Sequence, residues 1–264
     1  MAAAEGPSPL VELAVGEHVA VITLANPERR NVLDLPMAAA LREAAERAGS
    51  TEGVRCVVLT GSGNTFAAGA DIAELEAASS EENLAYNREL LAAVDAVAAI
   101  PVPTIAAVNG HAIGGGLELA CACVLRVASA KAKLGLPEVR LGIIPATGGL
   151  VRLPRLISPT AAAKLLLTGD LIGAAEAEAL GLVNAVVEPG LVTQEALAIA
   201  ARIVGAAPLS TRAILDSLRN DGGLPIAEAN RRVEERLATV LGSADRREGA
   251  RAFLERRDPV FSGS

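Results

Sequence analysis

Two glutamates and a run of three glycines are the residues of this 264-residue chain whose types and spacing best suit chemistry. Glu118 ends the segment Gly114-Gly115-Gly116-Leu117-Glu118, which reads as the start of a helix with a carboxylate in its first turn. Glycines let the backbone approach a ligand closely, and unpaired N–H groups at a helix start can hold a developing negative oxygen. The segment predicts a reactive carboxylate and oxyanion donors in one pocket. Tight packing of a strand against a helix would explain the glycines equally well.

A second carboxylate, Glu138, comes 20 positions later (138 − 118), in the apolar stretch Leu134-Gly135-Leu136-Pro137-Glu138. Proline followed by glutamate is also an ordinary helix start, so the residue types leave both interpretations open. Another glycine-bearing loop, at 64–72, leaves the strand-like run 54–60 and enters a helix-like segment from Asp71. This loop could supply a further backbone N–H to the same oxygen.

Short apolar runs alternate with helical stretches up to about residue 192. Strands are expected at 19–24, 56–60 and 104–108, and helices at 36–48, 72–76, 82–99 and 117–123. Repeated strand and helix units predict an α/β domain with largely parallel strands. From residue 193 the strand signals stop, and helices are expected at 193–203, 210–218 and 227–241.

Taken together, these segments resemble the crotonase superfamily, also called the enoyl-CoA hydratase/isomerase family. The match runs from 19–27 through Arg30-Asn31-Val32-Leu33 to 245–249 and 252–253, so it covers nearly the whole chain. The resemblance implies a crotonase-like spiral of ββα units with a C-terminal helical oligomerisation region. The expected organisation is a disordered leader at 1–9, the α/β catalytic core at 10–192 and the helical region at 193–264. By the same resemblance, the helical region would pack subunits into a homotrimer or a dimer of trimers.

The resemblance also assigns the site residues. In the family's pattern, the residue after glycine in Ala-Gly-Ala-Asp and the middle glycine of the triplet donate the oxyanion-hole N–H groups, here Ala70 and Gly115. Substrate binding is implied for Ala68, Ala70, Asp71, Ile72 and Gly115. Hydratase-type members carry both glutamates, and the resemblance assigns Glu118 to holding and activating water and Glu138 to donating the proton. Two close carboxyls titrate as a pair, so these roles could be shared.

The activity expected from the resemblance is that of an enoyl-CoA hydratase in fatty acid metabolism. Such an enzyme adds water across the 2,3 double bond of trans-2-enoyl-CoA through an enolate intermediate and gives 3-hydroxyacyl-CoA. The first alternative is a Δ3,Δ2-enoyl-CoA isomerase or another acyl-CoA enolate enzyme, because an oxyanion hole stabilises any thioester enolate. The second is a noncatalytic interaction protein on the same fold, against which the retention of both glutamates speaks. No cofactor is expected, because CoA is part of the substrate.

Four positions depart from the family's usual pattern, and one of them is Leu134, where many hydratases have phenylalanine. Ala73 stands where many hydratases have a lysine that can reach the CoA phosphates, so other basic residues and backbone contacts must take that role. Ala146 adds a methyl where many hydratases have glycine. Val124 replaces the usual aspartate after the first catalytic helix, and only altered local capping is expected there.

Composition excludes several classes of function. A net charge of −7 and a pI near 5.1 argue against nonspecific nucleic-acid binding, which needs a basic surface. No apolar stretch has the uninterrupted length to span a bilayer, and 1–9 lacks the basic and apolar regions of a signal peptide, so a cytoplasmic location is expected. Three cysteines and two histidines make neither a disulfide framework nor a metal site. The cysteines are expected to be reduced core residues, and His111 is expected to accept or donate a hydrogen bond rather than to act in catalysis.

Overall fold

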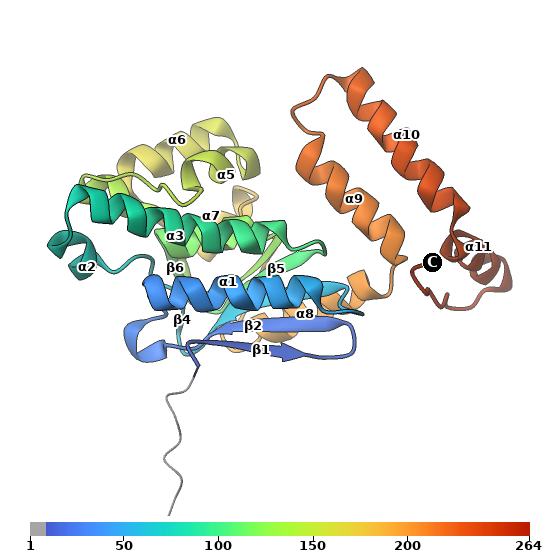
Figure 1. Cartoon of the computed structure of the whole chain (residues 1–264), viewed down its shortest axis with the longest axis horizontal. Helices are drawn as coiled ribbons and strands as arrows, with labels where there is room; N and C mark the ends of the chain where they lie inside the picture. Colours follow the sequence, from blue (N-terminus) through green and yellow to red (C-terminus); the bar gives the residue numbers. More distant parts are fainter. Residues whose placement is uncertain (1–8) are drawn as a thin grey trace, which may run out of the picture.

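Two β-sheets and the helices around them make up the protein (Figure 1), which a computed structural model describes over residues 9–264. The larger sheet has the strand order β1-β2-β3-β5-β7-β10 and the smaller sheet the order β4-β6-β8-β9. Within residues 9–264, β1 with β2 and β8 with β9 are the only antiparallel pairs, so the expectation of largely parallel strands is confirmed. The leader expected at 1–9 lies outside the described residues, except for Pro9.

The larger sheet consists of β1 (Val11–Val15), β2 (Val19–Leu24), β3 (Cys56–Gly61), β5 (Thr104–Val108), β7 (Leu125–Ser129) and β10 (Ala185–Val187), and the smaller of β4 (Thr65–Ala67), β6 (His111–Ile113), β8 (Lys133–Gly135) and β9 (Leu171–Gly173). The helices are α1 (Leu35–Ser50), α2 (Ile72–Ala77), α3 (Ser80–Ala99), α4 (Gly115–Ala122), α5 (Gly149–Leu156), α6 (Pro159–Thr168), α7 (Ala174–Ala179), α8 (Val192–Val204), α9 (Pro208–Asn220), α10 (Ile226–Gly242) and α11 (Ala244–Glu255), with short 3₁₀ helices η1 (Pro27–Arg29) and η2 (Pro137–Leu141).

Three successive turns of the chain each place one strand in each sheet before a helix. β3 and β4 precede α2 and α3, β5 and β6 precede α4, and β7 and β8 precede η2 and α5. This is the spiral of ββα units that the resemblance implied. The strands of the smaller sheet were not anticipated, because three residues are too few for an alternating pattern to show.

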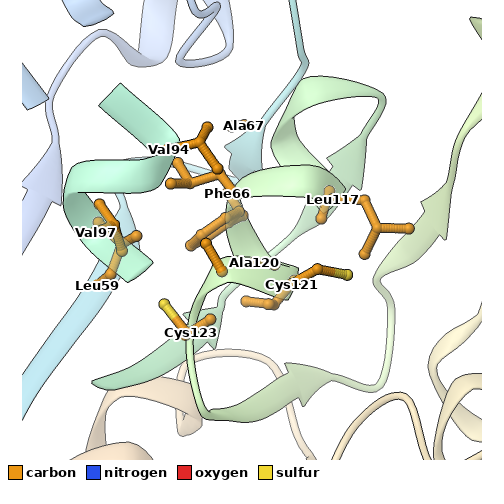
Figure 2. Packing of buried hydrophobic residues seen from close by; sticks show 14 of the residues in the cluster. Leu59, Phe66, Ala67, Val94, Val97, Leu117, Ala120, Cys121 and Cys123 are labelled. Atoms are coloured by element: carbon orange, nitrogen blue, oxygen red, sulfur yellow. The ribbon is translucent and has the colours of Figure 1, made fainter. Parts of the chain in front are cut away.

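Helices cover both faces of the larger sheet. On one face, α1 and α3 lie side by side (Figure 1). On the other, α8 buries Val192, Ala196 and Ala200 against strand residues such as Ile105. Figure 2 shows Phe66 of β4 among Val94 and Val97 of α3 and residues of α4. Burying each such large side chain contributes roughly 1.5–3 kcal/mol, so this core holds α4, the helix that carries Glu118, firmly in place.

The last three helices project from the two-sheet body (Figure 1). Asp221, at the end of α9, pairs with Arg236 of α10 at 2.5 Å and ties these two helices together. No residue of α10 is fully buried, and Val233, Leu237 and Leu241 are each about half exposed. Within residues 9–264, no single helix is long and apolar enough to cross a membrane; α8 and α9 together pass by length and composition, but they are bent by 112°.

Candidate active site

Glu118 lies in the first turn of α4, as the glycine run predicted. Its side chain is buried, with only 3% of the residue exposed. Two glycines make this helix start possible. Gly114 adopts φ 55°, a left-handed conformation that favours glycine, and a Cβ on Gly116 would lie 2.1 Å from the carbonyl oxygen of Ala67. The glycines thus bring α4 close to β4 and also shape the turn before Gly115.

Both carboxylate oxygens of Glu118 accept hydrogen bonds. The hydroxyl of Thr147 donates to Oε2, and the backbone N–H of Gly149 donates to Oε1 at 2.7 Å. Burial raises the pKa of Glu118 above its usual range, whereas these two hydrogen bonds and the positive charge of Arg152 act in the opposite direction. The side chain is consequently fixed in one orientation by donors that favour its ionised form.

Glu138 lies in η2 and is also buried, but its surroundings differ from those of Glu118. Within residues 9–264, its Oε2 has no hydrogen-bond partner. Burial, together with the negative charge of Glu118, raises the pKa of Glu138 to about 7. A Cβ placed on Gly114 would lie 2.9 Å from Glu138 Oε1, so this carboxyl group borders the glycine turn. Near neutral pH, Glu138 is therefore able to keep a proton, whereas Glu118 has hydrogen-bond donors that oppose the effect of its burial.

The two glycine-bearing loops meet beside these carboxyl groups. A Cβ on Gly69 would lie 3.2 Å from the Gly115 nitrogen, and a Cβ on Gly115 would lie 3.8 Å from the Ala70 nitrogen. In the part of the chain that the structure describes, neither the Ala70 N–H nor the Gly115 N–H donates a backbone hydrogen bond. Two unpaired donors from different loops thus lie near each other, an arrangement that can hold one negative oxygen.

A network of hydrogen bonds fixes the 64–72 loop against the chain before α1. The Leu33 N–H donates to the Gly69 carbonyl at 2.8 Å, and the Ala68 N–H donates to the Arg30 carbonyl at 3.1 Å. The Tyr86 hydroxyl donates to the Leu33 carbonyl and accepts from the Asp71 N–H. Tyr86 is buried and connects the chain before α1 with the 64–72 loop.

The residues expected to bind substrate surround the Ala70 N–H. Ala68, Ala70 and Asp71 are half-buried, whereas Ile72 is exposed. Asp71 caps α2 by accepting from the Ala73 N–H at 3.0 Å, and it also pairs with Arg29. A shallow cavity of about 270 Å³ opens here, lined by Glu28, Arg29, Arg30, Val32, Ala70, Asp71 and Ile72. The cavity places arginine side chains beside the start of α2, the helix in which Ala73 stands in place of lysine.

The cysteines and His111 match their expected roles. Cys56, Cys121 and Cys123 are buried free thiols, and burial raises the pKa of Cys121 to about 11 and of the other two to about 12. The Nδ1 of His111 accepts a hydrogen bond from the Lys133 N–H at 3.1 Å. These residues serve packing and local hydrogen bonding.

With both sheets, the spiral and the site in view, comparison with known proteins assigns the class. The chain matches the enoyl-CoA hydratase/isomerase family over residues 14–264 and belongs to it. It is 42% identical over 247 residues, 92% of this chain and 97% of the other, to a Thermus thermophilus protein assigned as an enoyl-CoA hydratase. It is 37% identical to the crotonyl-CoA hydratase of Syntrophomonas wolfei over 93% of this chain and 95% of that one. The crystal structure of an enoyl-CoA hydratase from Bacillus anthracis is similar with a TM-score of 0.93 at 34% identity, covering 97% of this chain and 100% of that chain.

Proposed function

We propose that this protein is an enoyl-CoA hydratase that adds water to trans-2-enoyl-CoA and forms 3-hydroxyacyl-CoA. One observation carries the proposal: two buried carboxyl groups, Glu118 and Glu138, lie close enough to influence each other's charge. Beside them are two N–H groups that donate to no backbone group within residues 9–264. Hydration needs a base for water, an acid for carbon and a donor pair for an oxyanion. This site offers all three.

In the proposed reaction, Glu118 removes a proton from water as the water oxygen forms a bond to C3 of the enoyl group. The electrons of the double bond move onto the thioester oxygen, and the N–H groups of Ala70 and Gly115 stabilise the resulting enolate. Loss of one such donor typically costs about 3 kcal/mol of transition-state stabilisation. Glu138 then gives its proton to C2 and the thioester carbonyl re-forms. Water is thereby added, and one proton returns from Glu118 to Glu138 before the next turnover.

The different surroundings of the two carboxyl groups support these roles. Glu118 accepts two hydrogen bonds, which favour the carboxylate needed to take a proton from water. The Oε2 of Glu138 accepts no hydrogen bond from any residue that the structure describes, and the pKa of about 7 leaves much of Glu138 protonated at neutral pH. General acid–base catalysis requires one group that accepts a proton and one that donates it, and the different hydrogen bonding of the two carboxyl groups suits these two roles.

The CoA part of the substrate is proposed to lie against the cavity beside Ala70. Its phosphates would meet Arg29 and Arg30 there, which offer positive charge although position 73 is alanine. The half-exposed apolar residues of α10 support assembly into a homotrimer or a dimer of trimers, because exposed apolar side chains in such a row usually pack against a partner.

Isomerisation of 3-enoyl-CoA to 2-enoyl-CoA is the second candidate, since the same two N–H groups would stabilise the same enolate. It needs only one carboxyl group to move a proton, so it leaves the second without a role. The test is to give the purified enzyme matched 2-enoyl-CoA and 3-enoyl-CoA substrates and to separate the products by chromatography. Faster formation of 3-hydroxyacyl-CoA from the 2-enoyl substrate supports hydration. A clear excess of isomerised product would assign the protein to the isomerases instead.

A further inference from the structure

Thr147 occupies a position next to the proposed base that residue type alone did not single out. It is buried, with 4% of the residue exposed, in the loop between η2 and α5. Its hydroxyl donates a hydrogen bond to Glu118 Oε2, while the Gly149 N–H donates one to Oε1. Gly149 provides a backbone group that any residue except proline would offer. The contact to Oε2, in contrast, depends on the side chain at position 147.

We propose that Thr147 is a positioning residue that orients the Glu118 carboxylate and favours its charged form through its hydroxyl hydrogen bond to Oε2. This inference deepens the proposed function, because it concerns the same carboxylate to which water activation is assigned. A carboxylate that accepts a hydrogen bond on each oxygen cannot rotate freely, so the two donors hold it in one orientation. Hydrogen bonds to a charged acceptor also stabilise the ionised form more than the neutral one.

The other charged groups around Glu118 do not replace this contact. Arg152 of α5 donates to the Thr147 carbonyl at 3.2 Å and pairs with Asp95 of α3, so its guanidinium is shared with an acid. Glu138 of η2 contributes a neighbouring acid, and the Cys121 thiol lies on α4 itself, where burial keeps it neutral. Arg152 lowers the pKa of Glu118, but less than the Thr147 hydroxyl does. Among the residues described, Thr147 is thus the principal side chain that favours the charged form.

The test compares Thr147→Val, which has nearly the same shape without the hydroxyl, with Thr147→Ser, which restores it. The control is Thr60→Val, because Thr60 also has a buried hydroxyl, which donates to the Ala107 carbonyl at 3.0 Å and to neither carboxyl group. The pKa of Glu118 is followed without substrate by infrared difference spectroscopy of the carboxyl band. Glu118→Gln identifies which signal belongs to Glu118.

Thr147→Val is expected to raise the pKa of Glu118 by about one unit or more, the size typical of one hydrogen bond to a charged group. Thr147→Ser and Thr60→Val should leave this pKa near the wild-type value. In turnover, the acid limb of kcat/KM should move to higher pH by the same amount in Thr147→Val only. An unchanged Glu118 pKa in Thr147→Val, or an equal rise in Thr147→Ser, would overturn the inference.

The titration also separates this inference from the proposed function. A wild-type enzyme that does not hydrate 2-enoyl-CoA would refute the function, while the substrate-free pKa values would still decide the role of Thr147. An active wild-type enzyme with no response of Glu118 to Thr147→Val would refute the inference and leave the function standing.

Discussion

Replacing Glu138 by glutamine is expected to stabilise the folded protein at alkaline pH, even though it removes a proposed catalytic group. The pKa of Glu138 rises from an ordinary 4.5 to about 7 because burial disfavours the charged carboxylate. Below about pH 4.5 the Glu138 carboxyl group is protonated in both the folded and the unfolded chain, so its ionisation does not lower the free energy of unfolding. As the pH rises toward 7, the unfolded chain ionises freely and the folded chain does not, so the wild-type protein loses stability.

The size of the effect follows from the shift. A difference of 2.5 units (7 − 4.5) corresponds to at most about 3.4 kcal/mol at 1.36 kcal/mol per unit. Solvent that reaches the site reduces this penalty. Relative to the wild type, Glu138→Gln is therefore expected to gain about 2 kcal/mol in the free energy of unfolding between about pH 5 and about pH 8. Glutamine keeps the shape of the side chain and cannot ionise.

The assay is denaturant unfolding of both proteins at the two pH values and at one protomer concentration, because an oligomer's stability depends on concentration. Glu46→Gln on α1 is the control, since it also removes one negative charge but lies on an exposed surface. The advantage of Glu138→Gln should appear only at the higher pH. If Glu138→Gln were more stable than the wild type by the same amount at both pH values, the raised pKa of buried Glu138 would be refuted.

Three further outcomes are expected. Gly115→Pro should abolish turnover while weakening acyl-CoA binding much less, because it removes the N–H assigned to the enolate; circular dichroism must first show an intact fold. Asn31→Ala should lower the free energy of unfolding by about 2 kcal/mol or more in a denaturant titration, because buried Asn31 donates to the carbonyls of Ser62 and Thr65. The alkaline limb of the kcat/KM profile should fall near pH 7, as Glu138 loses its proton, and a profile that stays flat up to about pH 9 would contradict this.

Local chemistry made part of the fold and site predictable. The apolar runs at 56–60 and 104–108 became β3 and β5, and the expected helix from Asp71 begins there because that aspartate caps α2. The position of Glu118 in the first turn of α4 also followed from the three glycines before it. In each case the signal lies within a few neighbouring residues. The boundary expected at residue 193 stays a prediction; α8, which begins at Val192, packs on the larger sheet.

The rest of the site depends on contacts between distant parts of the chain. Thr147 and Gly149 lie 29 and 31 positions after Glu118, and Tyr86 lies 53 positions after Leu33. A threonine or a tyrosine has no local pattern that reveals which carboxylate or carbonyl it will meet after folding. The unusual residues around Ala146 drew attention to the loop that contains Thr147, but its contact with Glu118 became visible only in the structure.

The most direct test of the account is the turnover of one good 2-enoyl-CoA substrate by Glu118→Gln, Glu138→Gln and the double variant. Each single change is expected to lower kcat by roughly 10²-fold or more with a much smaller effect on KM, because each removes a positioned proton-transfer group. The kcat of the double variant should be only slightly lower than that of the less active single variant, since the two groups act as a unit. If either single variant kept near-wild-type turnover, the two-carboxylate mechanism proposed for this site would be wrong.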